Sequence, residues 1–300
     1  MSGTLSPGES TVGFIGTGVM GAPMAGHVLA AGFDVVVWAR SAEKATGLLE
    51  AGAQWAETPT ELAARADAVV TIVGYPADVE ALYFGDDGGG DGSLLGAARP
   101  GTYLIDMTTS SPALARRIAE AASARGLRAL DAPVTGGDRG AREARLSIMV
   151  GGEEADAHAV EPLLRAMGTT VVHHGGPGCG QHAKICNQIA IAASMLGACE
   201  ALAYARGAGL DQARVLESIG AGSAGSWTLA NLAPRILAGD FAPGFFVKHF
   251  VKDLRIALAS AEELGLEVPG TQLAARLYET LLAAGHGEEG THALYHLYER

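Results

Sequence analysis

Cysteine is scarce in this sequence: the 300 residues include only three, Cys179, Cys186 and Cys199. An odd number confined to one stretch excludes the paired disulfide framework of a small secreted domain. Residues 1–10 also lack the basic and apolar regions of a signal peptide. We therefore predict a protein of the reducing cytoplasm.

Basic residues are also few, with 21 Lys and Arg against 33 Asp and Glu, a formal net charge of −12. Such a charge repels a phosphate backbone and an anionic membrane, so we predict no nucleic-acid and no membrane partner. No apolar run reaches the ~20 residues of a membrane span. A hydrophobic content of 48% with 18% charged residues indicates an ordered globular chain, and its length favours two domains.

Short apolar, β-branched runs alternate with helix-like stretches through the first part of the chain, which predicts a doubly wound α/β domain with a parallel sheet over residues 1–173. From about residue 180 the strand signal stops and helical periodicity takes over. We expect residues 174–300 to form an all-α domain for substrate binding and oligomerisation, joined to the first by a long interdomain helix. Residues 86–93, rich in Gly and Asp, predict a mobile surface loop. The runs assigned to strands are 12–15, 35–38, 68–73, 102–106, 129–131, 146–150 and 170–173.

A glycine-rich motif follows the first predicted strand and opens a helix, which is the context of a dinucleotide-binding Rossmann-type turn. Gly16 permits the tight turn, Gly18 lets a pyrophosphate approach the backbone, and Gly21 allows close packing of the helix on the sheet. A glycine-rich turn without a ligand is the alternative. The predicted cofactor contacts are Gly16, Thr17, Gly18, Val19, Met20 and Gly21.

The second predicted strand ends in Trp38-Ala39-Arg40-Ser41, without the carboxylate that usually binds the ribose 2′-hydroxyl of NAD. A guanidinium followed by a hydroxyl suits the 2′-phosphate of NADP. The sequence therefore favours NADP over NAD, with Arg40 and Ser41 as contacts. The alternative is a solvent-facing Arg40 and a Ser41 that caps the next helix.

Thr135, Gly136 and Gly137 follow Asp131-Ala-Pro-Val. Small residues expose backbone N–H groups beside a hydroxyl, and such a loop is suited to bind a substrate carboxylate. An ordinary Pro/Gly loop is the alternative.

Lys184, Asn187 and Gln188 share one face near the start of the long helix. A lysine at a helix start is disfavoured by the helix dipole, which suggests a functional reason for its position. A partly desolvated lysine can donate a proton to a carbonyl oxygen, and Asn187 can position the lysine or the substrate. The alternative is a solvated surface lysine.

His292 and His296 have i, i+4 spacing, but the segment lacks the Glu and third ligand of a zinc helix. We predict no metal site.

Taken together, these motifs resemble the β-hydroxyacid dehydrogenase family, which includes 3-hydroxyisobutyrate dehydrogenase and tartronate semialdehyde reductase. The likeness extends from Phe14 to Leu254. It implies that Lys184 is the catalytic lysine, Asn187 its substrate-orienting neighbour, and 135–137 the carboxylate loop. It further implies cofactor contacts at Val73, Gly74, Thr109 and Lys252. The chain has Thr135 where the family commonly has Ser, and Val73-Gly-Tyr-Pro76 where relatives often have Met-Leu-Pro.

The resemblance implies an oxidoreductase that moves a hydride between NADP(H), or NAD(H), and a short β-hydroxyacid or semialdehyde. The substrate would be of the 3-hydroxyisobutyrate, 2-hydroxy-3-oxopropionate, succinic semialdehyde or glyoxylate type, bound in a cleft between the domains. A homodimer or homotetramer is expected. The alternatives are an NADPH-dependent imine reductase, which typically lacks the lysine, and a non-catalytic NADP-binding sensor or scaffold.

Overall fold

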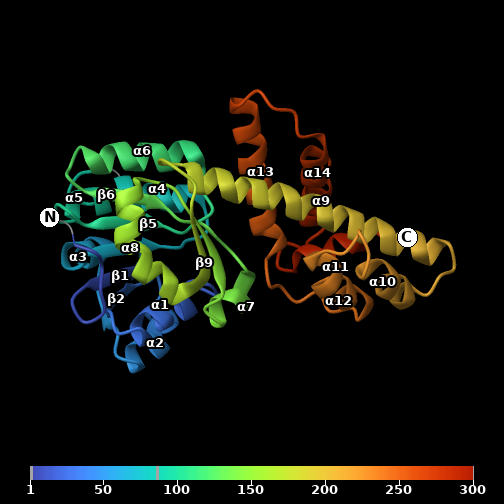
Figure 1. Ribbon diagram of the computed structural model, residues 1–300, viewed down its shortest axis with the longest axis horizontal. Coiled ribbons are helices and arrows are strands. Elements are labelled where there is room, and N and C mark those ends of the chain that lie inside the picture. The colour runs from blue at the N-terminus through green and yellow to red at the C-terminus, as the bar shows by residue number, and fades with distance from the viewer. Residues whose placement is uncertain (1–2, 86–87, 300) are drawn as a thin grey trace. The chain divides into compact units, whose positions relative to one another are not determined.

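The computed structural model describes residues 3–85 and 88–299 and contains two compact units, which meet in the chain at Lys184 and Ile185 (Figure 1). This point lies inside the long helix α9 (Cys179–Gly207), later than the predicted boundary at residue 173. The first turn of α9 belongs to the first unit because Gly178 and Gln181 donate backbone hydrogen bonds to Asp131.

The first unit is built on a six-stranded parallel sheet in the order β3-β2-β1-β4-β5-β6. Val12 of β1 is in register with Val35 of β2 on one side and Ala68 of β4 on the other. The order reverses beside β1, as in a doubly wound sheet, so the predicted fold is confirmed. The strands are β1 (Thr11–Ile15), β2 (Asp34–Trp38), β3 (Gln54–Trp55), β4 (Ala68–Thr71), β5 (Tyr103–Asp106) and β6 (Arg128–Asp131).

Helices cover both faces of this sheet, because alternate residues of each buried strand point to opposite sides. Phe14 packs in a core with Met24 of α1, whereas its neighbour Ile15 packs in a second core with Leu62 of α3 and Leu114 of α6. The helices around the sheet are α1 (Gly21–Ala30), η1 (Ala42–Ala45), α2 (Thr46–Glu50), α3 (Pro59–Arg65), α4 (Pro76–Phe84), α5 (Leu94–Ala97), α6 (Pro112–Ser123) and α8 (Glu154–Met167).

A second, three-stranded sheet follows β6, with β7 (Val134–Thr135) antiparallel to β8 (Leu146–Val150) and β8 parallel to β9 (Gly168–His173). The last two predicted strands belong here and not to the doubly wound sheet. Only Ala132 and Pro133 separate β6 from β7. That is too short for the crossover connection that another parallel neighbour of β6 requires.

The second unit is helical, apart from one isolated bridge between Phe246 and Gly290 in its described residues. Met195 and Cys199 of α9 share its core with Phe250 of α13 and Tyr278 of α14. Its elements after α9 are α10 (Gln212–Gly220), α11 (Trp227–Asn231), α12 (Ala233–Leu237), α13 (Val247–Glu263), α14 (Pro269–Ala283) and the 3₁₀ helix η2 (Thr291–Tyr298).

Helix α9 is long and apolar enough to cross a membrane, with a mean hydropathy of 1.4 over 18 residues. Length and composition alone are weak evidence for a span, because the core helix of a soluble protein passes the same test. Of that window, 44% is buried inside the chain. Its residues Ala192, Met195 and Leu202 pack into the core of the second unit, which accounts for the apolar composition.

The segment predicted as a mobile loop lies partly outside the described residues, which omit Asp86 and Asp87. Within the described part, Ser93 is buried and caps α5, since its hydroxyl accepts a hydrogen bond from Gly96 N at 3.1 Å. Arg125 donates a hydrogen bond to the carbonyl of Gly89. These contacts hold the end of the segment against the sheet domain.

A buried carboxylate, Asp106, ends β5. Its Oδ1 accepts hydrogen bonds from Thr71 Oγ1 at 2.9 Å and from Thr108 N at 3.1 Å, and Thr71 also bonds Tyr83 OH. Burial raises the pKa of Asp106 to about 6, and the hydrogen bonds from Thr108 and Thr71 limit the rise. The folded protein therefore keeps Asp106 protonated up to a higher pH than the unfolded chain does.

This raised pKa predicts a pH dependence of stability. The folded state binds the proton of Asp106 more tightly than the unfolded state, so the free energy of unfolding should fall by up to about 3 kcal/mol as pH rises from 4 to 6. Asp106→Asn keeps an acceptor for both hydrogen bonds and does not titrate. The urea concentration at the midpoint of its unfolding should therefore fall less between pH 4 and pH 6 than that of the wild type. The exposed Asp34→Asn is the control. An unchanged slope in Asp106→Asn would contradict the assignment.

Candidate coenzyme and substrate site

The glycine-rich turn lies between the carboxyl end of β1 and the start of α1. Gly16 has a φ of +100°, and a Cβ there would lie 2.2 Å from the carbonyl oxygen of Ile72. A Cβ on Gly21 would lie 1.8 Å from the oxygen of Gly16. Both positions therefore exclude any side chain, which agrees with the tight turn and close packing predicted for them.

The middle of this turn is open towards solvent. A Cβ on Gly18 would meet nothing within 4 Å, and Val19 is 59% exposed, while Met20 is half-buried. The hydroxyl of Thr17 is buried without a hydrogen-bond partner among the described residues. The open space at Gly18, at the amino end of a helix, fits the pyrophosphate of a dinucleotide.

Arg40 follows the carboxyl end of β2. Its side chain is 80% exposed, with Nη1 3.8 Å from Oδ1 of Asp78. Ser41 precedes η1 without capping it through its side chain, and its hydroxyl instead lies 3.4 Å from Glu43 Oε2. Ser41 therefore provides no side-chain cap, whereas Arg40 faces solvent, as the alternative expected. Its guanidinium is accessible to an anion.

Val73, Gly74 and Thr109 lie beyond the ends of β4 and β5. Strand β4 is the neighbour of β1 on the side away from β2, and β5 is the neighbour of β4. Val73 N donates a 3.0 Å hydrogen bond to Thr108 Oγ1, which ties the two loops together. These residues share the carboxyl edge of the sheet with the glycine turn, where open α/β sheets bind their ligands.

The predicted carboxylate loop lies at the end of β7. Gly136 and Gly137 have φ values of +130° and +63°, and α7 (Gly137–Arg142) starts at the second of them. Thr135, half-buried, pairs with Ser147 of β8. The loop is thus a glycine-dependent turn in which a hydroxyl and two backbone N–H groups follow one another.

Asp131, at the end of β6, holds the start of α9. Its Oδ1 accepts a hydrogen bond from Gly178 N at 2.8 Å, and its Oδ2 accepts one from Gln181 N at 2.7 Å. Burial raises the pKa of Asp131, opposed by these backbone N–H groups. The local sequence gives no sign of this role of Asp131, because its partners are 47 and 50 residues away in the chain.

Gln181 makes the second connection at the start of α9. Its fully buried amide donates to Thr108 O at 2.7 Å and accepts from Ser110 N at 2.9 Å. It therefore fastens the helix to the loop that carries Thr109. A sequence signal for it existed, because Gln181, Lys184 and Gln188 recur on one helical face, and all three are buried.

Lys184 is only 6% exposed, so the alternative of a solvated surface lysine is wrong. Asn187 lies one turn further along α9 and is half-buried. Its Nδ2 donates a 2.7 Å hydrogen bond to Gln188 Oε1, and Gln188 Nε2 donates to Asp253 Oδ2 at 2.6 Å. Asn187 is thus oriented by a buried amide and a buried carboxylate.

Lys252 of α13 lies in the same network of the second unit. Its Nζ lies 2.9 Å from Asp253 Oδ1, and its side chain is 13% exposed. Lys248, one turn earlier, instead pairs with Glu288 at 2.6 Å. Lys252 and Asp253 thus form an ion pair that is largely shielded from solvent and is not a surface pair.

A doubly wound sheet with a glycine turn at its switch point and a buried lysine on the following long helix defines the class of dinucleotide-dependent α/β enzymes. The family models agree with this class. Residues 11–176 match the NAD-binding domain of 6-phosphogluconate dehydrogenase, and residues 178–298 match the NAD-binding domain of NADP-dependent 3-hydroxyisobutyrate dehydrogenase.

Relatives match along almost the whole chain. An uncharacterized oxidoreductase of Bacillus subtilis, YkwC, is 52% identical, and the alignment covers 97% of this chain and 99% of that protein. The probable mitochondrial 3-hydroxyisobutyrate dehydrogenase-like protein 1 of Arabidopsis thaliana is 46% identical, and the alignment covers 100% of this chain and 88% of that protein. The chain belongs to the β-hydroxyacid dehydrogenase family, as its motifs predicted.

Solved structures support the same assignment. The 3-hydroxyisobutyrate dehydrogenase of Mycobacterium tuberculosis, solved with L-serine, superimposes with a TM-score of 0.88 at 31% identity, covering 97% of this chain and 99% of that one. Psf3, solved with NADP⁺ and 2-OPP, has a TM-score of 0.86 at 27% identity, with coverages of 95% and 99%. The protein is an NAD(P)-dependent hydroxyacid dehydrogenase.

The role of Asp131 is testable by stability. Asp131→Asn replaces one acceptor oxygen with an NH₂ group that faces a backbone N–H, so the free energy of unfolding at pH 7 should fall by about 1–3 kcal/mol. Urea unfolding measures the change. The control is Glu80→Gln, at an exposed pair with Arg117, where the change should stay within about 0.5 kcal/mol. Equal effects in the two variants would refute the anchoring role of Asp131.

Proposed function

We propose that this enzyme interconverts a short β-hydroxyacid and its semialdehyde, with Lys184 as acid and base and NADP(H) as the preferred coenzyme. The observation that carries the proposal is a buried lysine on the second turn of a helix whose start is fastened by Asp131 and Gln181. Those anchors tie the helix to the ends of β6 and β5, beside the loops that would contact coenzyme and substrate.

In the direction of reduction, Lys184 donates a proton to the carbonyl oxygen of the semialdehyde as that oxygen becomes the hydroxyl. In the direction of oxidation, its neutral amine accepts the hydroxyl proton. Because the Lys184 side chain is only 6% exposed, few water molecules compete for this proton. The coenzyme, when bound, supplies or accepts the hydride.

The substrate carboxylate would bind the hydroxyl of Thr135 and the backbone N–H groups of Gly136 and Gly137, with the amide of Asn187 as a further donor. Positive φ values at both glycines support this role, because they allow successive N–H groups to turn towards one anion. Fixing the carboxylate places the reacting carbon at a constant distance from Lys184. We expect 3-hydroxyisobutyrate, L-serine and short semialdehydes to be the compounds to test.

The coenzyme would lie along the Gly16–Gly21 turn, with Val73, Gly74 and Thr109 as contacts and Lys252 as a further cation. Preference for NADP is supported by Arg40, whose exposed guanidinium follows β2 where no carboxylate occupies the position of an NAD ribose contact.

The partners would be a small carboxylate substrate and further copies of the chain in a homodimer or homotetramer, with no nucleic acid and no membrane. Strongly exposed apolar side chains in the second unit support self-association: Tyr204, Leu210 and Trp227 are 78%, 54% and 67% exposed. A cytoplasmic location is supported by the three cysteines, all of which are free.

The catalytic role of Lys184 is tested by Lys184→Met, which keeps the length of the side chain and removes its ionisable group. We expect kcat to fall by about 10²–10⁴-fold for reduction of the best semialdehyde, because a general acid contributes that much. NADPH affinity, measured by fluorescence titration, should change by less than threefold, since the glycine turn is untouched.

Lys248→Met is the matched control, because Lys248 is a lysine paired with Glu288 at the surface. Its kcat should equal that of the wild type. Lys184→Met with undiminished kcat would disprove the assignment. A wild type that binds NADPH and turns over none of these substrates would favour the sensor or imine reductase alternatives.

Coenzyme preference is tested by Arg40→Ala. Loss of a charge-assisted bond to phosphate should lower the ratio of kcat/KM for NADPH to that for NADH by about 10–100-fold. Arg117→Ala, another exposed arginine, should leave the ratio unchanged. If the ratio is the same in Arg40→Ala as in the wild type, Arg40 does not contact the 2′-phosphate.

A further inference from the structure

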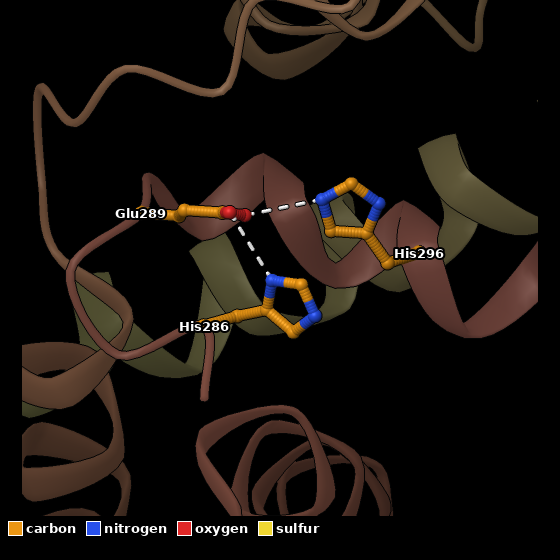
Figure 2. Close-up of side chains that lie close together, drawn as sticks. All are labelled: His286, Glu289 and His296. Atoms are coloured by element: carbon orange, nitrogen blue, oxygen red, sulfur yellow. Dashed lines mark hydrogen bonds and ion pairs between the residues drawn. The ribbon is translucent and has the colours of Figure 1, made fainter. Parts of the chain in front are cut away.

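Three potential metal ligands lie together where α14 leads into η2: His286, Glu289 and His296 (Figure 2). His286 Nδ1 lies 3.1 Å from Glu289 Oε1, and His296 Nε2 lies 3.1 Å from Glu289 Oε2. All the ligand atoms of the group lie within 4.8 Å of one another. The carboxylate thus faces both imidazole rings.

Two imidazole nitrogens and one carboxylate form a donor set that divalent transition metals prefer. In a tetrahedral zinc site, ligands at about 2.0–2.1 Å from the ion are themselves about 3.3 Å apart. The two carboxylate-to-imidazole distances are already near that value. The rings are stacked with centroids 4.6 Å apart, so they need to rotate until both ring planes contain the ion.

The second nitrogen of His296 has its own partner. Nδ1 lies 2.9 Å from Glu299 Oε2, on the side of the ring opposite the Nε2 that faces Glu289. With an ion bound to Nε2, Nδ1–H would donate to Glu299. Such outer carboxylates orient histidines in metal sites. The ring of Phe241, 4.2 Å away between centroids, packs against the same imidazole. His296 is therefore oriented by two neighbours outside the candidate ligands.

His292, four residues before His296, does not take part in this cluster. His292 is buried, and its Nε2 contacts the carbonyl of Asp240 at 2.7 Å. Since η2 is a 3₁₀ helix with three residues per turn, residues four apart do not share a face. His296 instead faces residues of the preceding loop, which the spacing of the two histidines could not reveal.

We propose that His286, Glu289 and His296 bind one divalent transition-metal ion of the Zn²⁺ type, with water completing the coordination. The ion would clip η2 to the loop after α14. That loop is bonded to the start of α13, because Val247 N donates to Glu289 O at 2.9 Å and Lys248 N donates to Gly287 O at 3.2 Å. Bound metal would thus stabilise the helical unit around the helix that carries Lys252.

The test is titration of chelator-treated full-length protein with ZnCl₂ at pH 7.5, followed by calorimetry and by the melting temperature. We expect one equivalent to bind the wild type and to raise its melting temperature. Binding should weaken at least tenfold in His286→Gln and in His296→Gln. Titration with CoCl₂ should give visible d–d absorption in the wild type and none in these variants.

Two further variants keep the test decisive if a ligand substitution perturbs folding. Glu299→Gln removes no ligand and should weaken zinc binding by about 10–100-fold. His158→Gln is the matched control: this exposed histidine has Glu154 and Glu161 nearby at 3.9 and 3.8 Å, and its loss should change nothing. Absence of saturable binding, or equal binding by the wild type and all variants, would overturn the proposal.

Discussion

The buried carboxylate of Asp131 connects the sheet to the long helix, and the placement of Lys184 depends on this connection. One oxygen accepts from Gly178 N and the other from Gln181 N, so both backbone groups at the helix start are satisfied by the end of β6. A negative charge at a helix amino end is also favoured by the helix dipole. Lys184, less than one turn later, therefore has a defined position relative to the sheet edge.

The close packing around this connection leaves little freedom for it to vary. A Cβ on Gly180 would lie 2.5 Å from the backbone carbonyl oxygen of Asp131, and a Cβ on Gly151 would lie 2.5 Å from the Oδ1 of Asp131. Gln181 adds bonds to both sides of Thr109. Coenzyme loops and the proposed acid are thus parts of one hydrogen-bonded structure within the first unit, which suits a reaction that requires fixed distances.

The second unit repeats this pattern with different residues. Asp253 is buried at 2% exposure and contacts both Gln188 and Lys252. A buried charge is tolerated when it is paired and hydrogen-bonded, and here the partners include the neighbour of Asn187. The proposed metal site, on the loop that meets α13, would add a further constraint in the same unit.

Much of the fold and part of the site followed from the sequence by itself, because they depend on near neighbours in the chain. The glycine turn, the alternation of strands and helices and the helical second half are of this kind, and so are the candidates Arg40 and Lys184. Only the tertiary structure decided which distant groups meet. Asp131 and Gln181 are 50 residues apart, Thr108 and Gln181 are 73 apart, and Gln188 and Asp253 are 65 apart. The separate sheet of β7, β8 and β9 and the facing of His286 and His296 arise in the same way. Periodicity identifies the buried face of an element, whereas the partner on that face is set by how the elements pack.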